Sequence, residues 1–233
     1  MIIAIDGPAG AGKSKITTLL AQKLGWNYLD TGALYRAITV KMLDMGVDTH
    51  DPKAIAKACE SIKINVKYID GKQHTFANEE DVTPRLRTQQ ISNTSAQISP
   101  VKEVRANVKK LQRDLAKSQN IIVEGRDIGT VVLPESKNKF FLTASVDVRT
   151  ERRAKQLEES GHIADRVAIR KEIEERDRLD STRKLSPLTL AHDAILIDTS
   201  NLNENQVITA ILSQMKFAPN SKKSTVQEPE LGK

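Results

Sequence analysis

The chain has 233 residues, of which 39% are hydrophobic and 28% are charged, and its formal net charge is +6. This is the composition of a globular protein with a sizeable core, and no apolar run approaches the roughly 20 residues that cross a bilayer. The basic residues are scattered among 30 acids and accompany no zinc-ligand spacing and no aromatic–basic pattern. The charge therefore favours attraction of a small phosphate-bearing ligand over nucleic-acid binding.

Two features bear on the compartment. The run at residues 2–5 meets Asp6 and is too short for the core of a signal peptide. The single Cys59 cannot form a disulfide within the chain, which fits a reducing compartment, and we expect its thiol to be buried and inert. We expect a cytoplasmic monomer that binds neither membranes nor nucleic acid.

Residues 7–14 read Gly-Pro-Ala-Gly-Ala-Gly-Lys-Ser and satisfy the phosphate-loop pattern G-x-x-x-x-G-K-[ST] in full. A β-branched run precedes this loop, and an amphipathic helix that Gly25 can close follows it. Glycines let the backbone aim N–H groups at phosphate oxygens, and the helix directs its positive end to the same place. We expect Lys13 to reach the β- and γ-phosphates of ATP and Ser14 to bind Mg²⁺. The expected ATP-binding residues are Gly7, Pro8, Ala9, Gly10, Ala11, Gly12, Lys13, Ser14 and Lys15.

Short apolar runs then alternate with helical patterns, which predicts a parallel α/β sheet. The expected strands are residues 121–123, 140–142 and 194–197, and the expected helices carry apolar stripes at residues 101–115 and 207–215. For the helix at 101–115, Ser99 is the expected N-cap and Pro100 the expected first residue.

One stretch departs from this rhythm. Apolar and polar residues alternate from Ile62 to Tyr68, the dipeptide Asp70-Gly71 is a type I′ hairpin signal, and residues 73–76 can form the returning strand. We therefore expect a small antiparallel module between about residues 51 and 84, beginning with a short helix.

Two polar segments follow expected strands and should lie at the same edge of the sheet as the phosphate loop. In residues 30–36, the Thr31 hydroxyl and the Arg36 guanidinium are candidates for binding an acceptor phosphate. Residues 124–130 follow the strand at 121–123 and include Arg126. The chain contains neither the D-x-x-G nor the N-K-x-D string of GTPases, which leaves a small kinase.

Taken together, these blocks resemble bacterial cytidylate kinases, which are P-loop nucleoside monophosphate kinases that move the γ-phosphate of ATP onto CMP or dCMP. The likeness spans about the first 215 residues. It rests on residues 7–14, 30–36, 87–89, 125–130 and 175–178, with Asp180 and Arg183. The resemblance implies an α/β fold of three layers, a P-loop kinase core with a parallel sheet, to which a small antiparallel insertion in the monophosphate-binding domain and a short lid are added.

The resemblance also implies a domain plan and residue roles. The kinase domain would span residues 1–216, with the insertion at about 36–100 and the lid at about 150–166. Residues 217–233 lack periodicity, and we expect them to be a disordered tail. The implied substrate contacts are the phosphate clamp Thr31, Arg36 and Arg126, the cytosine readers Arg105 and Asp127 with Arg183 nearby, and the pentose contacts Arg176 and Asp180.

Phosphoryl transfer needs positioning and charge stabilisation more than proton chemistry. We expect direct in-line transfer, with Lys13, Mg²⁺, Arg126 and a lid arginine neutralising the moving group. Arg149, Arg152 and Arg153 lie on the expected lid helix, and Arg153 is the one we assign as catalytic.

Three residues depart from the usual family pattern: Glu124 replaces Asp, Ala96 replaces Ser and Lys15 replaces Thr. Blander interpretations also exist. Glu172, Arg176, Asp180 and Lys184 stand four apart, as on an exposed salt-bridged helix face, while Thr31 alone suits a turn or cap and Arg126 alone suits a structural ion pair. The alternative functions are a kinase for UMP, AMP or a non-nucleotide hydroxyl, and a non-catalytic ATP-binding module that binds nucleic acid.

Overall fold

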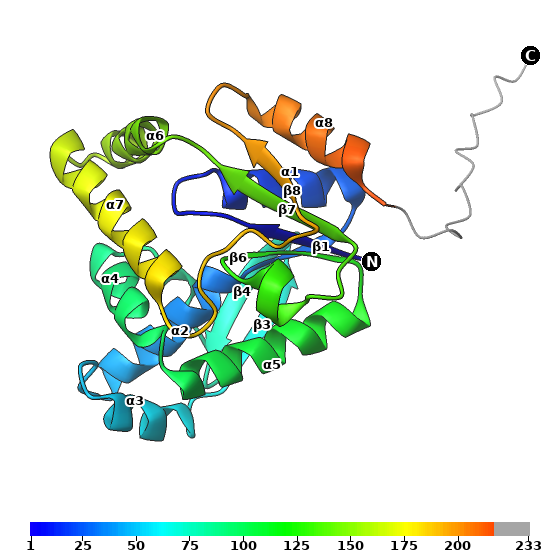
Figure 1. Ribbon diagram of the computed structural model, residues 1–233. Helices are drawn as coiled ribbons and strands as arrows, with labels where there is room; N and C mark the ends of the chain where they lie inside the picture. The colour runs from blue at the N-terminus through cyan, green and yellow to red at the C-terminus, as the bar shows by residue number, and fades with distance from the viewer. Residues whose placement is uncertain (217–233) are drawn as a thin grey trace, which may run out of the picture.

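The computed structural model describes residues 1–216 and is built around a five-stranded parallel sheet (Figure 1). The strand order is β2-β6-β1-β7-β8, so β2 and β8 are the edges. The strands are β1 (Ile2–Asp6), β2 (Asn27–Asp30), β6 (Ile121–Gly125), β7 (Asn138–Thr143) and β8 (Ile195–Asp198). The three apolar runs predicted as strands are confirmed, although Ala194 lies just outside β8.

Helices cover both faces of this sheet and give three layers. Helices α1 (Lys13–Leu24) and α8 (Glu204–Gln214) pack on one face, and α2 (Thr31–Asp44) and α5 (Lys102–Ser118) pack on the other. Along β1, Ile3 and Ile5 join the core beneath α1 and α8, whereas Ala4 joins the core beneath α2 and α5. Because both faces are buried, the strands read as continuous apolar runs in the sequence.

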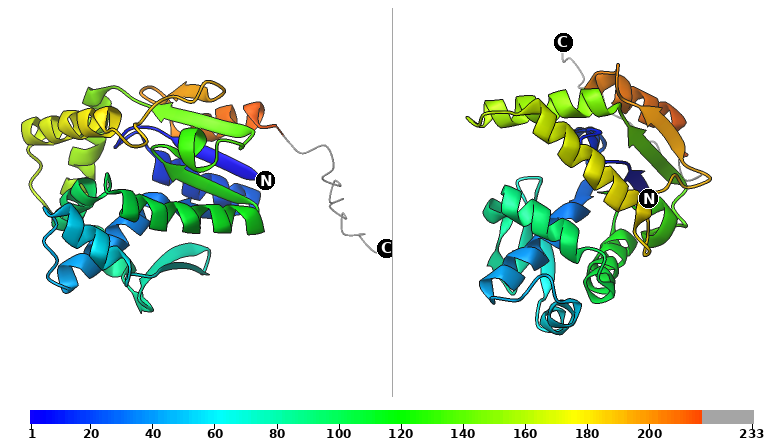
Figure 2. Two further views of the ribbon diagram at one scale, coloured as in Figure 1. Left: turned by 60° about the horizontal axis from the view of Figure 1, so that its bottom comes forward. Right: turned by 60° about the vertical axis from the view of Figure 1, so that its left-hand side comes forward.

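The predicted antiparallel module is present as a three-stranded sheet, β3 (Ile64–Ile69), β4 (Lys72–Ala77) and β5 (Glu80–Asp81). At the β3–β4 turn, Asp70 and Gly71 have φ of 50° and 70°, the positive values that a type I′ turn requires. The helix before it, α3 (Pro52–Cys59), is capped by Asp51. In the left view of Figure 2 this small sheet lies below α5, on the side of the molecule opposite α8.

Five further elements complete the described part of the fold. They are a 3₁₀ turn (Thr83–Arg85), α4 (Gln89–Ile98), the short π-helix η2 (Ile128–Val132), α6 (Val146–Glu159) and α7 (Arg166–Thr182). A cluster containing Ala154, Ile169 and Ile173 holds α6 against α7. The right view of Figure 2 shows α7 crossing in front of the sheet, with α6 above it and α4 below it.

One sequence prediction about these elements is wrong. Ser99 does not cap α5, because it is the C-cap residue of α4, where its N–H bonds to the Ser95 carbonyl. A tight turn at Pro100 follows, closed by the Val101 N–H on the Ile98 carbonyl, and Val101 becomes the N-cap of α5. Pro100 therefore lies in the turn between α4 and α5 and is not the first residue of α5.

Other predictions are confirmed or stay open. Cys59 is buried, as expected, and burial raises the pKa of its thiol to about 11, so the thiol is protonated at neutral pH. Within the described part of the chain, no helix is both long and apolar enough to cross a membrane. The tail predicted at 217–233 lies outside the described residues. The boundaries at about 36–100 and 150–166 stay predictions.

Candidate active site

The site forms where three neighbouring strands end. In the sheet register Asp6 lies beside Gly125, and Asp30 lies beside Glu124. The phosphate loop, residues 30–36 and residues 125–130 therefore begin next to one another at the carboxyl edge of the sheet, where α/β folds bind ligands. This is the edge that the sequence predicted.

The phosphate loop has the backbone that its glycines permit. Gly7, Gly10 and Gly12 have φ of 148°, 78° and 86°, values that side chains disfavour. A Cβ at Gly7 would also lie 2.0 Å from the Leu142 carbonyl oxygen, so only glycine fits there. Lys13 is buried, its Nζ donates to the Pro8 carbonyl at 2.7 Å, and burial lowers the pKa of its ammonium group. An anion in the loop would compensate that buried charge.

Glu124 and Ser14 offer oxygen atoms beside Lys13. Glu124 is buried, and burial together with the charge of Asp30 raises the pKa of its carboxyl group. The charge of Lys13 and a hydrogen bond from Ser14 lower the pKa of Glu124 and partly offset this rise. One carboxylate oxygen of Glu124, Oε1, has no hydrogen-bond partner. A hydroxyl and a buried unpartnered carboxylate oxygen are the hard donors that Mg²⁺ prefers, so these residues fit the metal. Lys15 is exposed.

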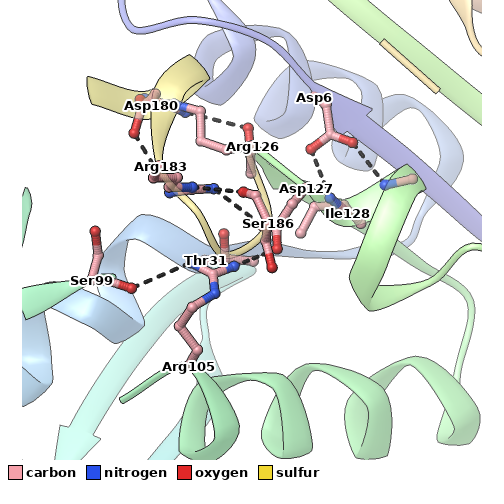
Figure 3. A network of polar contacts seen from close by, with 12 residues as sticks. Asp6, Thr31, Ser99, Arg105, Arg126, Asp127, Ile128, Asp180, Arg183 and Ser186 are labelled. Carbon is pink, nitrogen blue, oxygen red and sulfur yellow. Dashed lines mark hydrogen bonds and ion pairs between the residues drawn. The ribbon is translucent and has the colours of Figure 1, made fainter. Parts of the chain in front are cut away.

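Asp6 connects the two halves of the site and was missed by the sequence analysis. Its carboxylate accepts the N–H groups of Ile128 at 2.9 Å and Gly129 at 2.7 Å, directly after the Arg126–Asp127 pair (Figure 3). Burial raises the pKa of Asp6 to about 6 despite these two bonds. The available signal was an acid at the end of a buried strand, immediately before the phosphate loop.

Arg126 faces the end of α7. Its Nε donates to the Asp180 carboxylate at 2.9 Å, and Arg183 approaches the same carboxylate at 3.6 Å. Burial alone would raise the pKa of Asp180, but the charges of Arg126, Arg176 and Arg183 outweigh it and hold that pKa below its ordinary value. The predicted residues Arg126 and Asp180 are thus brought together from two distant parts of the chain.

A second ion-pair group lies beside it. Arg105 on α5 pairs with Asp127, and Arg183 lies 3.9 Å from the other oxygen of that carboxylate. Arg105 also donates to the Ser99 carbonyl at 3.3 Å, and Arg183 donates to the Ser186 carbonyl at 2.6 Å (Figure 3). Burial, with the charge of Arg105, lowers the pKa of Arg183. The structure therefore places the three proposed cytosine contacts in one cluster.

Arg36 and Arg176 carry donors without partners. Arg36 pairs with Asp30 at 2.9 Å, yet its Nε is buried and unpartnered, and so is the Nε of Arg176. Burial, followed by the charges of Arg126, Arg36 and Arg153, lowers the pKa of Arg176 to about 10, although the charge of Asp180 acts in the opposite direction. The guanidinium groups of Arg126, Arg36 and Arg153 thus lie close enough to that of Arg176 to repel it, and a bound phosphate dianion would relieve this repulsion.

Two simpler interpretations can now be judged. In the described residues Asp180 pairs with Arg126 and Arg183, so α7 does not carry the exposed four-residue ladder that its spacing allowed. The Thr31 hydroxyl is buried and donates to the Glu124 carbonyl at 2.7 Å, while Asp30 is the residue that caps α2. Thr31 therefore already uses its only side-chain proton.

The three lid arginines differ in their surroundings. Arg149 is buried: it donates to the Ala9 carbonyl of the phosphate loop at 3.1 Å and pairs with Asp177 at 2.6 Å. Arg152 donates to Thr199 at 3.0 and 2.7 Å. Arg153 is half-buried and bonds to the side-chain oxygens of Gln156 and Gln89, which are neutral partners that an anion can displace.

Comparison with known proteins decides between the kinase families. Residues 3–217 match the family model described as cytidylate kinase. The chain belongs to the cytidylate kinase family. It is 44% identical to a cytidylate kinase of Caldicellulosiruptor bescii over 90% of this chain and 93% of that protein. It is also 44% identical to one of Carboxydothermus hydrogenoformans over 91% and 96%, and 42% identical to one of Shouchella clausii over 92% and 95%.

The family departures can be located in this cytidylate kinase fold. Glu124 is the buried carboxylate beside Ser14, so the longer side chain is accommodated at the end of β6. Ala96 lies on α4, and the neighbouring Ser95 is buried. Arg105 donates a hydrogen bond to the carbonyl of Ser99, the C-cap residue of α4.

Proposed function

We propose how the residues of this site divide the work of a cytidylate kinase. As a member of that family, the chain transfers the γ-phosphate of ATP to CMP and gives CDP and ADP. The phosphate loop holds the ATP phosphates with its backbone N–H groups, Lys13 contacts the β- and γ-phosphates, and the exposed backbone of Lys15 contributes one N–H.

The acceptor phosphate is assigned to Arg36 and Arg126, as the resemblance implied. We add Arg176, which the resemblance had implied as a pentose contact, because its Nε is buried without a partner. The observation that carries this assignment is the convergence of these guanidinium groups with Arg153, two of them with buried and unpartnered Nε atoms. A CMP phosphate accepts charge-assisted bonds from such groups and relieves the repulsion that the other arginines exert on Arg176. The Thr31 hydroxyl donates to the Glu124 carbonyl, so it connects the start of α2 to the end of β6 and has no proton left to donate to the phosphate.

Cytosine is assigned to the Arg105, Asp127 and Arg183 cluster. The Asp127 carboxylate accepts from the exocyclic amino group, and the arginines donate to the ring carbonyl and ring nitrogen. Uracil presents a carbonyl at the position of that amino group, which a carboxylate repels, so Asp127 selects against UMP. Asp180 accepts hydrogen bonds from the pentose hydroxyls. If its contact is with the 3′-hydroxyl, which deoxyribose retains, dCMP is a substrate as well.

Mg²⁺ is proposed as the metal that accompanies ATP. Ser14 would hold it, with Glu124 close by, and the unpartnered buried oxygen of Glu124 supports this site. When bound, the ion screens the negative charge on the ATP phosphates.

The protein acts in the transfer step by positioning and charge. An oxygen of the CMP phosphate attacks the γ-phosphorus in line, and no proton needs to be removed because that oxygen is already an anion. Lys13, Arg126 and Arg153 neutralise the transferring group. Closure of α6 and α7 over the site excludes water and suppresses ATP hydrolysis. We further propose a monomer acting in the cytoplasm without a nucleic-acid partner, which the buried Cys59 and the small-ligand site support.

The direct test is product analysis. The purified chain with CMP, ATP and Mg²⁺ should form CDP and ADP in equal amounts. Anion-exchange chromatography of the products measures both. Release of ADP without CDP would show an ATPase and contradict the proposal.

A further inference from the structure

Gln73, in the antiparallel module, covers an open edge of the main sheet. Asp30 is the last residue of β2, and β2 is an edge strand. The Asp30 N–H donates to the Gln73 Oε1 at 2.7 Å, and the Gln73 Nε2 donates to the Asp30 carbonyl at 3.2 Å. The side-chain amide therefore takes the place of a missing neighbouring strand and satisfies both backbone groups of one residue.

The surroundings of Gln73 hold this amide in place. Gln73 is 9% exposed, and its Nε2 also lies 3.2 Å from the hydroxyl oxygen of the buried Thr75. A second contact at the same edge is separate from it: the Tyr68 hydroxyl donates to the Tyr28 carbonyl at 2.7 Å. The Gln73 backbone N–H also donates to the Tyr28 hydroxyl at 3.5 Å. The module is thus hydrogen-bonded to both Tyr28 and Asp30 of β2, and only the Gln73 side chain reaches Asp30, the residue that precedes α2.

Asp30 also contacts residues on the acceptor side of the site. Its carboxylate accepts the Ala33 N–H at 3.1 Å, which caps α2, and it pairs with Arg36 at 2.9 Å. Gln73 holds the backbone of Asp30, and the Asp30 carboxylate holds Arg36. A displacement of Asp30 would move both the start of α2 and the guanidinium group assigned to the CMP phosphate.

We propose that Gln73 is a positioning residue for the acceptor phosphate, through which the antiparallel module fixes Asp30 and hence Arg36. The inference rests on the proposed function, because it takes Arg36 as a CMP contact. The phosphate loop and Lys13 lie outside this chain of hydrogen bonds and ion pairs, so we expect a larger effect on CMP than on ATP.

The test is a steady-state comparison of Gln73→Leu with Tyr68→Phe. Gln73→Leu removes both bonds to Asp30 and keeps an apolar side chain of similar size. We expect it to raise KM for CMP about tenfold, since each lost hydrogen bond costs a factor of a few, and to leave KM for ATP within about twofold. Tyr68→Phe removes the hydrogen bond from the module to the Tyr28 carbonyl of β2, and we expect both KM values to stay near wild type.

A second variant covers the case in which Gln73→Leu does not fold. Gln73→Glu retains the acceptor for the Asp30 N–H but sets a carboxylate against the Asp30 carbonyl, and it should also raise KM for CMP selectively. An unchanged KM for CMP in a folded Gln73 variant overturns the inference, and so does an equal rise in KM for ATP or an equal effect of Tyr68→Phe. Failure of the wild type to phosphorylate CMP is a different result, because it overturns the proposed function itself.

Discussion

Removing Arg126 should nearly abolish transfer while leaving the protein folded. In Arg126→Ala the site loses a charged donor that pairs with Asp180 and lies close enough to Lys13 to lower its pKa, in the region where the acceptor and transferring phosphates are proposed to meet. A hydrogen bond to a charged group contributes about 1.5–3 kcal/mol, and Arg126 can make one or two of them in the transition state. A loss of about 3–4 kcal/mol corresponds to a fall of roughly 10²–10³-fold in kcat/KM.

Stability should change much less. Asp180 loses its 2.9 Å partner but keeps Arg183 at 3.6 Å, and Lys13 loses a repulsive neighbour. We expect the free energy of unfolding to change by less than about 2 kcal/mol. Arg126→Lys keeps the charge without the planar fork and should fall between wild type and Arg126→Ala.

The assay couples ADP formation to NADH oxidation at saturating MgATP with varied CMP, and urea denaturation gives the stability. Arg85→Ala is the matched control, because it removes an exposed arginine that pairs with Asp44 at the end of α2. It should leave kcat/KM near wild type. If Arg126→Ala keeps kcat/KM for CMP within tenfold of wild type, the assignment of Arg126 to the reacting phosphates is wrong.

Three further predictions follow from the charges of the site. Because burial raises the pKa of Asp6 from 3.8 to about 6, the folded state binds its proton more tightly than the unfolded state, and stability falls by up to about 3 kcal/mol as pH rises from about 4 to 7. Asp6→Asn should lack this loss in denaturation series over that range, and an unchanged pH dependence would contradict the Asp6 assignment. Asp127→Asn should lower kcat/KM for CMP by roughly 10–100-fold and lower the CMP-to-UMP ratio, since an amide also donates to uracil; a preserved ratio argues against Asp127 as the base reader. Because burial lowers the pKa of Lys13 and phosphate raises it again, ATP binding at pH 8 should take up protons, measured by titration calorimetry in two buffers of different ionisation enthalpy. Binding without proton uptake would refute that role for Lys13.

The sequence predicts the parts of this protein whose signals are local. The phosphate loop, the strand runs and the Asp70-Gly71 turn follow from backbone requirements of nearby residues, and the structure confirms them. The two-residue strand β5 and the start of α5 were missed, because the first has no periodicity and the second depends on how Pro100 is used.

The site is harder to predict because its chemistry depends on contacts between distant segments. The spacing of Arg176 and Asp180 equally suits an exposed helix face, and only the approach of Arg126 shows that Asp180 faces the site. Asp6 and Gln73 act through backbone groups of other segments, and no sequence pattern records such contacts. The family resemblance indicated which residues belong to the site, and the structure shows which of them pair with one another.

The central claim is that this site is built for CMP, and a nucleoside monophosphate panel tests it most directly. Initial rates with ATP and Mg²⁺ should give kcat/KM values highest for CMP, with dCMP next, and at least tenfold lower for UMP and AMP. A preference for AMP or UMP over CMP would contradict the assignment of Arg105, Asp127 and Arg183 to cytosine.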